Sequence, residues 1–452
     1  MTRSLYNEKN IIGSLYKYFS VYFENYSTPT AETLFLLILS VLVLGSAHSI
    51  RFLFKHFASS VTEKSLNAFY YACSYAKIDT HSFMNTTVRI ALKLIPEYLY
   101  AHPVFLCIDD TMVAKFGKKF DNVAVLFDHA KHNGANYLNG HCFVSLMLCI
   151  PVWLDNEDKI RYISIPLGYR MWEKDSATKL NLAADMVRQV MPELKSKQVI
   201  ILCDGWYVKR PFAQVIKEFD NLNLIGNARV DSAIYELPPA PTGKKGRPRK
   251  HGNKLSIYDD FRLSEEKIGD YYIASKKVIT NIFDSQAVMA YVTASDKSSN
   301  NRRLFFSTIM PHELNMFCAH MEKAPLNQVG SSWMQYIPLF CYSFRWNIEI
   351  SYYEQKLFWS LDKYMLRSKR GIETFINLIN IAYCAMKILP YKDDKYSEYK
   401  DSSAQNFRFS LSEQIRQVVI FDTFVKTVEN QIKSSIVLTK LKQAVRAFGC
   451  YL

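Results

Sequence analysis

The sequence lacks the cysteine patterns of disulfide-stapled and zinc-binding proteins. Its nine cysteines are odd in number and never form a CxxC pair. Several of them, such as Cys107, Cys149 and Cys203, lie inside apolar runs. This usage is typical of reduced thiols in the core of an intracellular protein. The sequence therefore argues against a disulfide framework and against a zinc site built from cysteine pairs.

A hydrophobic run long enough to span a membrane is also missing. The most apolar run, TLFLLILSVLVLG, holds about a dozen residues before Gly45, and a spanning helix needs roughly twenty. The first residues, MTRSLYNEKN, do not have the layout of a signal peptide. We therefore expect the run to form a buried core helix in a protein that does not enter a membrane.

Acidic residues are too few to balance the basic ones. Lys and Arg number 56 against 42 Asp and Glu, which gives a formal net charge of +14. Such an excess favours a polyanionic partner, either nucleic acid or an anionic membrane surface. The basic residues are not gathered on one amphipathic helix, so the membrane surface is the weaker candidate.

The apolar patterns predict an α/β core between helical ends. Residues 1–100 have helical periodicity, and 104–108, 141–154 and 161–167 are typical of strands. A helix with Asp175 or Ser176 as its N-cap should follow, then a strand at 198–204 and a helix that begins near Pro211. The order of these elements favours a mixed sheet flanked by helices.

Beyond residue 228 the pattern changes twice. The stretches LSIYDDFRL, YYIASKKVIT, QAVMAYVTAS and RLFFSTIM alternate as strands do. A long helix from about residue 332 and further amphipathic helices over 364–452 should follow. The middle segment is therefore interpreted as a β-rich insertion in the α/β core.

Carboxylates follow two of the predicted strands. Asp109 and Asp110 come after the first strand, and Asp204 comes after the fourth. Ligands in open α/β sheets bind outside the carboxyl ends of the strands, so these acids converge if the two strands are neighbours. The alternative for each position is an ordinary turn residue, with Asp204 capping a turn before Gly205.

Charged residues also lie on the apolar helix that contains YSFRWNIEISYYEQK. Arg345, Glu349 and Lys356 fall on one stripe of this helix at offsets of three, seven and fourteen from Tyr342. A salt-bridged helix face is the simpler explanation.

These motifs together resemble the DDE-class insertion-sequence transposases, which have an RNase H-like core. The spacing of Tyr342, Arg345, Glu349 and Lys356 matches the Tyr-Arg-Glu-Lys signature of one subgroup. IDDTMVAKFGK, NGHCFV and CDGWY match further family motifs, and the resemblance extends over roughly residues 30–390. It implies metal-dependent phosphoryl transfer on DNA.

The resemblance also implies roles for single residues. Asp204 and Glu349 correspond to the second and third metal-binding acids, and the first is Asp109 or Asp110. Its position directly after the strand favours Asp109, and both stay candidates. The implied cofactor is Mg²⁺, with two ions in each active site and Mn²⁺ as a substitute. The family residues that hold DNA near the cleaved end correspond to Tyr342, Arg345 and Lys356.

A basic stretch, KKGRPRK, lies within the β-rich segment. It resembles an AT-hook, in which arginines enter the narrow minor groove of A·T-rich DNA. A solvated loop that contacts DNA without base preference is an equal alternative. The residues predicted to bind DNA here are Lys244, Lys245, Arg247, Arg249 and Lys250.

Two other groups of residues were considered for chemistry. Trp206 and Tyr207, beside Asp204, are of a type that stacks on bases, although packing is the better interpretation. Histidines near the second strand have spacing that fits no standard zinc template, so a metal site there is disfavoured. The second group is His129, His132, His141 and Cys142.

The sequence thus predicts an RNase H-like α/β protein that is a DNA transposase. It would act in the cytoplasm with the nucleoid, as a homodimer on the DNA of element ends and target. A nuclease of the same core without strand transfer, and a catalytically silent DNA-binding descendant, are the alternatives. The predicted parts are a helical region that is a candidate for DNA binding (1–100), the first part of the core (101–228), the insertion (229–330), the rest of the core with the Glu349 helix (331–390) and a helical end (391–452).

Overall fold

Two compact units make up the chain in the computed structural model. One unit, here the helical unit, comprises Met1–Thr87, Val113–His141 and Tyr352–Leu452. The other, the sheet unit, comprises Val88–Met112 and Cys142–Ser351. The structure describes residues 10–117, 119–127, 136–154, 159–240, 249–297, 301–318, 331–431 and 435–448.

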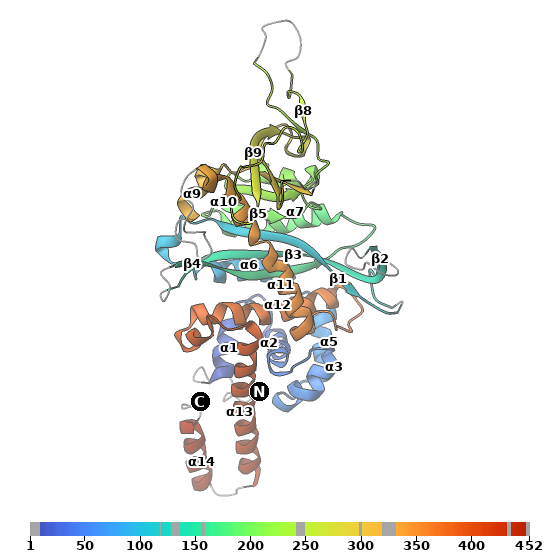
Figure 1. Cartoon of the computed structure of the whole chain (residues 1–452). Coiled ribbons are helices and arrows are strands. Elements are labelled where there is room, and N and C mark those ends of the chain that lie inside the picture. The colour runs from blue at the N-terminus through green and yellow to red at the C-terminus, as the bar shows by residue number, and fades with distance from the viewer. Residues whose placement is uncertain are drawn as a thin grey trace. The chain divides into compact units, whose positions relative to one another are not determined.

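A mixed sheet forms the core of the α/β part (Figure 1). The described strands follow the order β2-β3-β1-β5-β6-β11-β10-β9-β7-β8, and β4 pairs with β3. The predicted RNase H-like α/β fold class is confirmed. The first six strands are β1 (Val104–Ala114), β2 (Ala124–Phe127), β3 (Tyr137–Leu154), β4 (Lys159–Met171), β5 (Val199–Cys203) and β6 (Leu222–Ala228).

The centre of this sheet is parallel and buried on both faces. β1 pairs in parallel with β5, and β5 pairs in parallel with β6. The five residues Val104–Ile108 and all of β5 are buried, which explains why these strands are continuous apolar runs. The strand that leads into Asp109 and the strand before Asp204 are therefore neighbours, as predicted. Asp109 and Asp110, however, lie within β1 and not after it, because β1 continues beside β3 to Ala114 once its pairing with β5 ends at Ile108.

The antiparallel half of the sheet continues from β6 through β11. Three predicted strands are confirmed as β9, β10 and β11, but the strand expected over LSIYDDFRL is wrong. Only Lys254–Leu255 pairs there, because the Asp260 side chain accepts the amide of Ser256 at 2.7 Å and bends the chain into a turn. The strands are β7 (Ile234–Tyr235), β8 (Lys254–Leu255), β9 (Tyr272–Ile279), β10 (Ala287–Ala294) and β11 (Arg302–Ser307).

Helix α7 (Lys179–Val190) begins later than the sequence predicts. Thr178 is its N-cap, and the Thr178 hydroxyl accepts the amide of Asn181 at 3.2 Å. The expectation of Asp175 or Ser176 is wrong because the chain turns helical only after Thr178. The helix predicted near Pro211 is the single turn α8 (Arg210–Ala213).

The predicted long helix from residue 332 is two helices. α10 (Ser331–Ser343) ends before a turn, and α11 (Trp346–Trp359) begins after it. In the turn the amides of Phe344 and Arg345 bond to carbonyls three residues back instead of four. Tyr342 thus belongs to α10, Arg345 to the turn, and Glu349 to α11.

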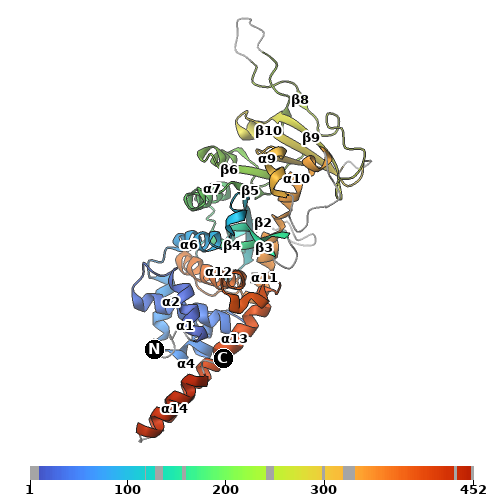
Figure 2. The ribbon, with the colours of Figure 1, turned by 90° about the vertical axis from the view of Figure 1, so that its left-hand side faces the viewer.

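Helices dominate the helical unit, as expected for both ends of the chain. α1, α2 and α13 contact one another (Figure 2), and the apolar run predicted to be a core helix is α2, buried from Thr33 to Val43. In the described part of the chain, α12 is long and apolar enough to cross a membrane, and 89% of that apolar segment is buried in the protein. The helices are α1 (Ile11–Ser20), α2 (Thr28–Val43), α3 (Ile50–Leu53), α4 (Ser59–Val61), α5 (Leu66–Ser74), α6 (Thr80–Leu92), α12 (Lys369–Lys392), α13 (Ala404–Gln431) and α14 (Ser435–Phe448).

Candidate active site

The neighbouring parallel strands β1 and β5 position Asp109 and Asp204. Ile108 of β1 is in register with Cys203 of β5. Asp109 and Asp204 follow these two residues directly, so they are also neighbours across the sheet, and residues in register point to the same face. The apolar strands fix both backbones, which makes this pair of carboxylates a rigid feature.

The turn between α10 and α11 packs against the sheet and forms hydrogen bonds to it. The ring of Phe344 stacks on Phe105 of β1 at 5.2 Å, and the Phe344 carbonyl accepts the thiol of Cys107 at 3.5 Å. The side chain of Asn347 donates to Ser164 of β4 at 2.8 Å. These contacts hold Arg345, which lies between Phe344 and Asn347, and Glu349, two residues further on, beside β1.

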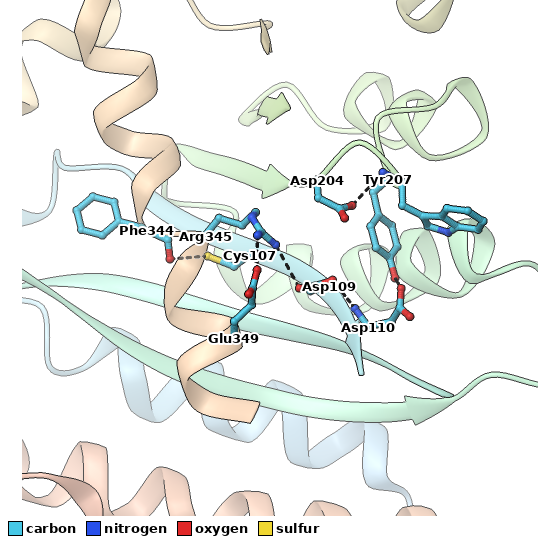
Figure 3. A network of polar contacts seen from close by, with 9 residues as sticks. Cys107, Asp109, Asp110, Asp204, Tyr207, Phe344, Arg345 and Glu349 are labelled. Atoms are coloured by element: carbon cyan, nitrogen blue, oxygen red, sulfur yellow. Dashed lines mark hydrogen bonds and ion pairs between the residues drawn. The ribbon is translucent and has the colours of Figure 1, made fainter. Parts of the chain in front are cut away.

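Arg345 joins two of the acids. Its guanidinium donates to Asp109 Oδ2 at 3.2 Å and also to Glu349 Oε1, and Figure 3 shows it reaching toward both. Arg345 is only 12% exposed, and its buried Nε has no hydrogen-bond partner among the described residues. A buried cation with spare donor capacity therefore lies among the carboxylates.

The acids in this site repel one another. Burial raises the pKa of Asp109 to about 7, and the neighbouring Asp204 adds to the rise while Arg345 opposes it. Burial likewise raises the pKa of Asp204, again with Arg345 opposing. Two desolvated carboxylates that destabilise each other's charge are stabilised by a cation between them.

Asp110 has different surroundings, as expected for the next residue of a strand. Its carboxylate accepts Lys179 Nζ at 2.7 Å, the Tyr207 hydroxyl at 3.0 Å and the Cys142 thiol at 3.2 Å. Figure 3 shows Tyr207 meeting Asp110 and Arg345 meeting Asp109. The structure thus links Asp109 to Glu349 through Arg345, makes Asp204 an electrostatic neighbour of Asp109, and gives Asp110 partners of its own.

Lys179 was not among the residues predicted from the sequence. It is the first residue of α7, far along the chain from Asp110, and no spacing rule links the two. For Tyr207 the sequence offered packing as the better interpretation, and the side chain is fully buried. Its position three residues after Asp204 is the one signal that could have tied it to the acids.

The predicted DNA-binding residues lie at several places. Tyr342 is half-buried and packs edge-on against Phe305, with ring centroids 5.1 Å apart. Lys356 lies in the last turn of α11. Arg249 and Lys250 are exposed. Lys244, Lys245 and Arg247 lie outside the described residues, and the DNA contacts of the whole set stay predictions.

The histidine group has no metal-binding geometry where it is described. His141 is fully buried, with Nδ1 at 2.6 Å from the Tyr364 hydroxyl and Nε2 at 2.8 Å from the Asp121 carbonyl. Cys142 donates to Asp110. His129 and His132 lie outside the described residues. His141 is therefore a buried structural histidine with both nitrogens engaged.

The donor set of the site suits a divalent cation of the hard type. Carboxylate oxygens are the ligands that Mg²⁺ and Mn²⁺ prefer. In the arrangement of the described residues no three acids, histidines or cysteines already form a metal-binding group, because Arg345 lies between Asp109 and Glu349. A cation held by Asp109, Asp204 and Glu349 therefore requires the guanidinium to turn away.

Comparison with known proteins gives the family. Curated proteins include no match. The family model described as DDE superfamily endonuclease matches residues 37–271, which is more than half of the chain. The matched segment contains Asp109, Asp110 and Asp204, whereas Glu349 lies beyond it. This chain therefore belongs to the DDE superfamily of endonucleases, which act on DNA by phosphoryl transfer.

Proposed function

We propose that this protein is a DNA transposase that cleaves the ends of a mobile element and joins them to target DNA. The observation that carries the proposal is that Arg345 joins Asp109 of β1 to Glu349 of α11, while Asp204, directly after β5, is the neighbour of Asp109 across the sheet. The spacing of Tyr342, Arg345, Glu349 and Lys356 further supports the transposase subgroup that has the Tyr-Arg-Glu-Lys signature. The protein would work in the cytoplasm, on nucleoid DNA.

Asp109, Asp204 and Glu349 would hold two Mg²⁺ ions, or Mn²⁺ in their place. DDE-type endonuclease domains generally use divalent metal ions. Such ions, when bound, activate the attacking water or hydroxyl and stabilise charge on the leaving oxygen. Strand ends and a packed helix are rigid elements, so the three carboxylates would keep the spacing that the reaction needs.

Arg345 would change partner during the reaction. Without a cation it neutralises Asp109 and Glu349. Once the carboxylates hold a cation, the guanidinium is free to contact a DNA phosphate, to which it can donate two parallel hydrogen bonds. Tyr342 and Lys356 would also contact DNA, as the signature spacing implies.

The reaction has two phosphoryl-transfer steps. In the first, water attacks a phosphodiester at the element end and releases a 3′ hydroxyl. In the second, that hydroxyl attacks a target phosphodiester, forming one P–O bond while the target P–O bond breaks. Two ends must be held together for this, so we propose that a homodimer assembles on the paired ends.

Basic residues outside the site would supply general DNA affinity. Arg249 and Lys250 are exposed at the end of the predicted basic loop. Phosphate contacts of this kind release counterions, so the affinity for DNA should fall steeply as salt rises.

A transposition assay with purified protein tests the proposal. A donor plasmid carries the DNA that flanks this gene, and a second plasmid is the target. With Mg²⁺ we expect breaks at fixed positions and products in which donor ends are joined to the target. Breaks without joined products would favour a nuclease, and binding without breaks would favour a silent DNA-binding protein.

A further inference from the structure

The turn after Asp204 presents one large aromatic side chain to solvent. Trp206 is 48% exposed, whereas its neighbours Tyr207 and Val208 are 0% and 4% exposed. An exposed indole beside a catalytic carboxylate is unusual, because Trp is normally highly buried. Packing therefore accounts for Tyr207 and leaves Trp206 unexplained.

The backbone that carries Trp206 is held firmly. The Asp204 carboxylate accepts the amide of Trp206 at 3.0 Å, and the Asp204 carbonyl accepts the amides of Tyr207 and Val208 at 3.1 and 3.2 Å. Val208 packs closely against Gly226 of β6, where an added Cβ would come within 2.5 Å of the valine. A ring on such a turn can bind a partner with little loss of backbone entropy.

Positive charge surrounds the exposed ring. Lys209 Nζ lies 3.9 Å from the centroid of Trp206, and Lys179 Nζ lies 5.6 Å from it. Because the Lys209 ammonium lies over the ring, it has to move aside before a flat group can stack there. The site therefore suits a ligand that has a flat π system and, close to it, a negative charge to receive the displaced ammonium. A nucleotide within a DNA strand has both.

We propose that Trp206 stacks on an unpaired base next to the phosphate that reacts at Asp204, and that Lys209 contacts the adjoining phosphate. Stacking needs an exposed base face, so the substrate DNA would be locally unpaired beside the active site. This inference rests on the proposed function and adds a preference for unpaired DNA. A protein partner is the weaker occupant, because the flanking lysines and the net charge of +14 select for polyanions.

Stacking can be measured with a single-stranded oligonucleotide that carries one fluorescent adenine analogue, whose emission is quenched when it stacks. EDTA keeps the DNA intact. The wild-type protein and Trp206→Phe should quench the analogue. Trp206→Leu should lose the quenching and bind the oligonucleotide about tenfold more weakly, while binding of the matched duplex changes much less.

Tyr98→Leu is the matched control. Tyr98 is exposed to 64% but does not follow a strand-end acid, so this variant should behave as wild type. Thermal unfolding of Trp206→Leu should match wild type, because the side chain is exposed. The inference alone would be overturned if Trp206→Leu quenched the analogue as strongly as wild type. It would also be overturned if Trp206→Leu lost self-association of the protein without a change in quenching, because the exposed ring would then bind protein and not a base. Failure of the wild-type protein to bind either DNA would instead count against the proposed function.

Discussion

At the scale of single residues, the adjacent acids Asp109 and Asp110 of β1 have different surroundings. The Asp110 carboxylate accepts hydrogen bonds from Lys179 Nζ at 2.7 Å and from the Tyr207 hydroxyl at 3.0 Å. Asp109 is desolvated beside Asp204, which disfavours its charge, and Arg345 compensates only in part. Asp109 therefore suits cation binding, and Asp110 suits holding β1 to α7 and to the turn after Asp204.

The first prediction concerns Asp109→Asn and pH. The folded protein keeps the Asp109 proton up to a pKa of about 7, while the unfolded chain releases it near 3.8. Between these values the folded state binds more protons, so stability falls as pH rises, and the loss is complete above about pH 7. Without metal, Asp109→Asn should be more stable than wild type by about 4 kcal/mol at about pH 8, and within about 1 kcal/mol of it near pH 4.

Urea unfolding at the two pH values measures this difference. Mg²⁺ added at the higher pH should stabilise the wild type and leave Asp109→Asn unchanged, since cation binding needs the ionised carboxyl. Asp110→Asn is the control and should lose stability, because it breaks the ion pair with Lys179. A wild-type stability that does not fall with pH relative to Asp109→Asn would contradict the account of Asp109.

At the scale of elements, a buried arginine closes the end of α2. Arg408 of α13 is 2% exposed and donates to the carbonyls of Val41 at 2.8 Å and Leu42 at 3.3 Å, and also to that of Leu44. These are among the last carbonyls of the helix, which have no partner within it. Arg408 thus satisfies three carbonyls at the end of α2, and Ser412 and Arg416 donate to the carbonyl of Val43 between them.

The second prediction is that Arg408→Met lowers the free energy of unfolding by about 3 kcal/mol. The variant leaves several carbonyls buried without donors. Chemical denaturation measures the loss. Lys426→Met is the control, because Lys426 forms one ion pair on the surface of the same helix with Asp422, and such pairs contribute less than about 1 kcal/mol. Equal effects of the two substitutions would refute the capping role.

Gly140, the glycine of the NGHCFV motif, lies where β3 and β1 approach each other closely. A Cβ at Gly140 of β3 would lie 2.2 Å from the backbone carbonyl oxygen of Val113 in β1. Backbone atoms of a sheet cannot yield as a flexible side chain does, so only glycine fits at this position.

The third prediction is therefore that Gly140→Ala destabilises the protein by about 2 kcal/mol or more. The melting temperature, measured by circular dichroism, provides the test. Gly45→Ala serves as the control, because an added Cβ there meets nothing within 4 Å. A Gly140→Ala variant as stable as the control would show that the strands can separate easily.

Many of the helices and strands could be predicted from the sequence. The apolar runs of β1, β3 and β5 and the helical ends have clear periodicity, and their order predicts an α/β sheet. The RNase H-like fold class was implied by the resemblance of the motifs to a known family. The break between α10 and α11 was not accessible, because the contacts of Phe344 and Asn347 with the sheet are long-range. The same holds for Lys179, whose approach to Asp110 depends on the path of the chain after β4.

At the scale of the whole molecule, charge and family agree on the kind of substrate. The net charge of +14 favours a polyanion, and the endonuclease family acts on DNA. The family match ends at residue 271, so the third acid rests on the signature spacing and on the geometry of α11. Glu349 is thus the part of the proposed site that most needs a direct test.

Cleavage of a plasmid that carries the flanking DNA, compared between wild type and Glu349→Gln, gives this test. The account predicts Mg²⁺-dependent breaks at fixed positions with the wild type, none with Glu349→Gln, and none with EDTA. Glu354→Gln should cleave as wild type, because Glu354, on the same helix, bonds to Tyr383 instead of the acids. Cleavage by Glu349→Gln at the wild-type rate would contradict the assignment of the site.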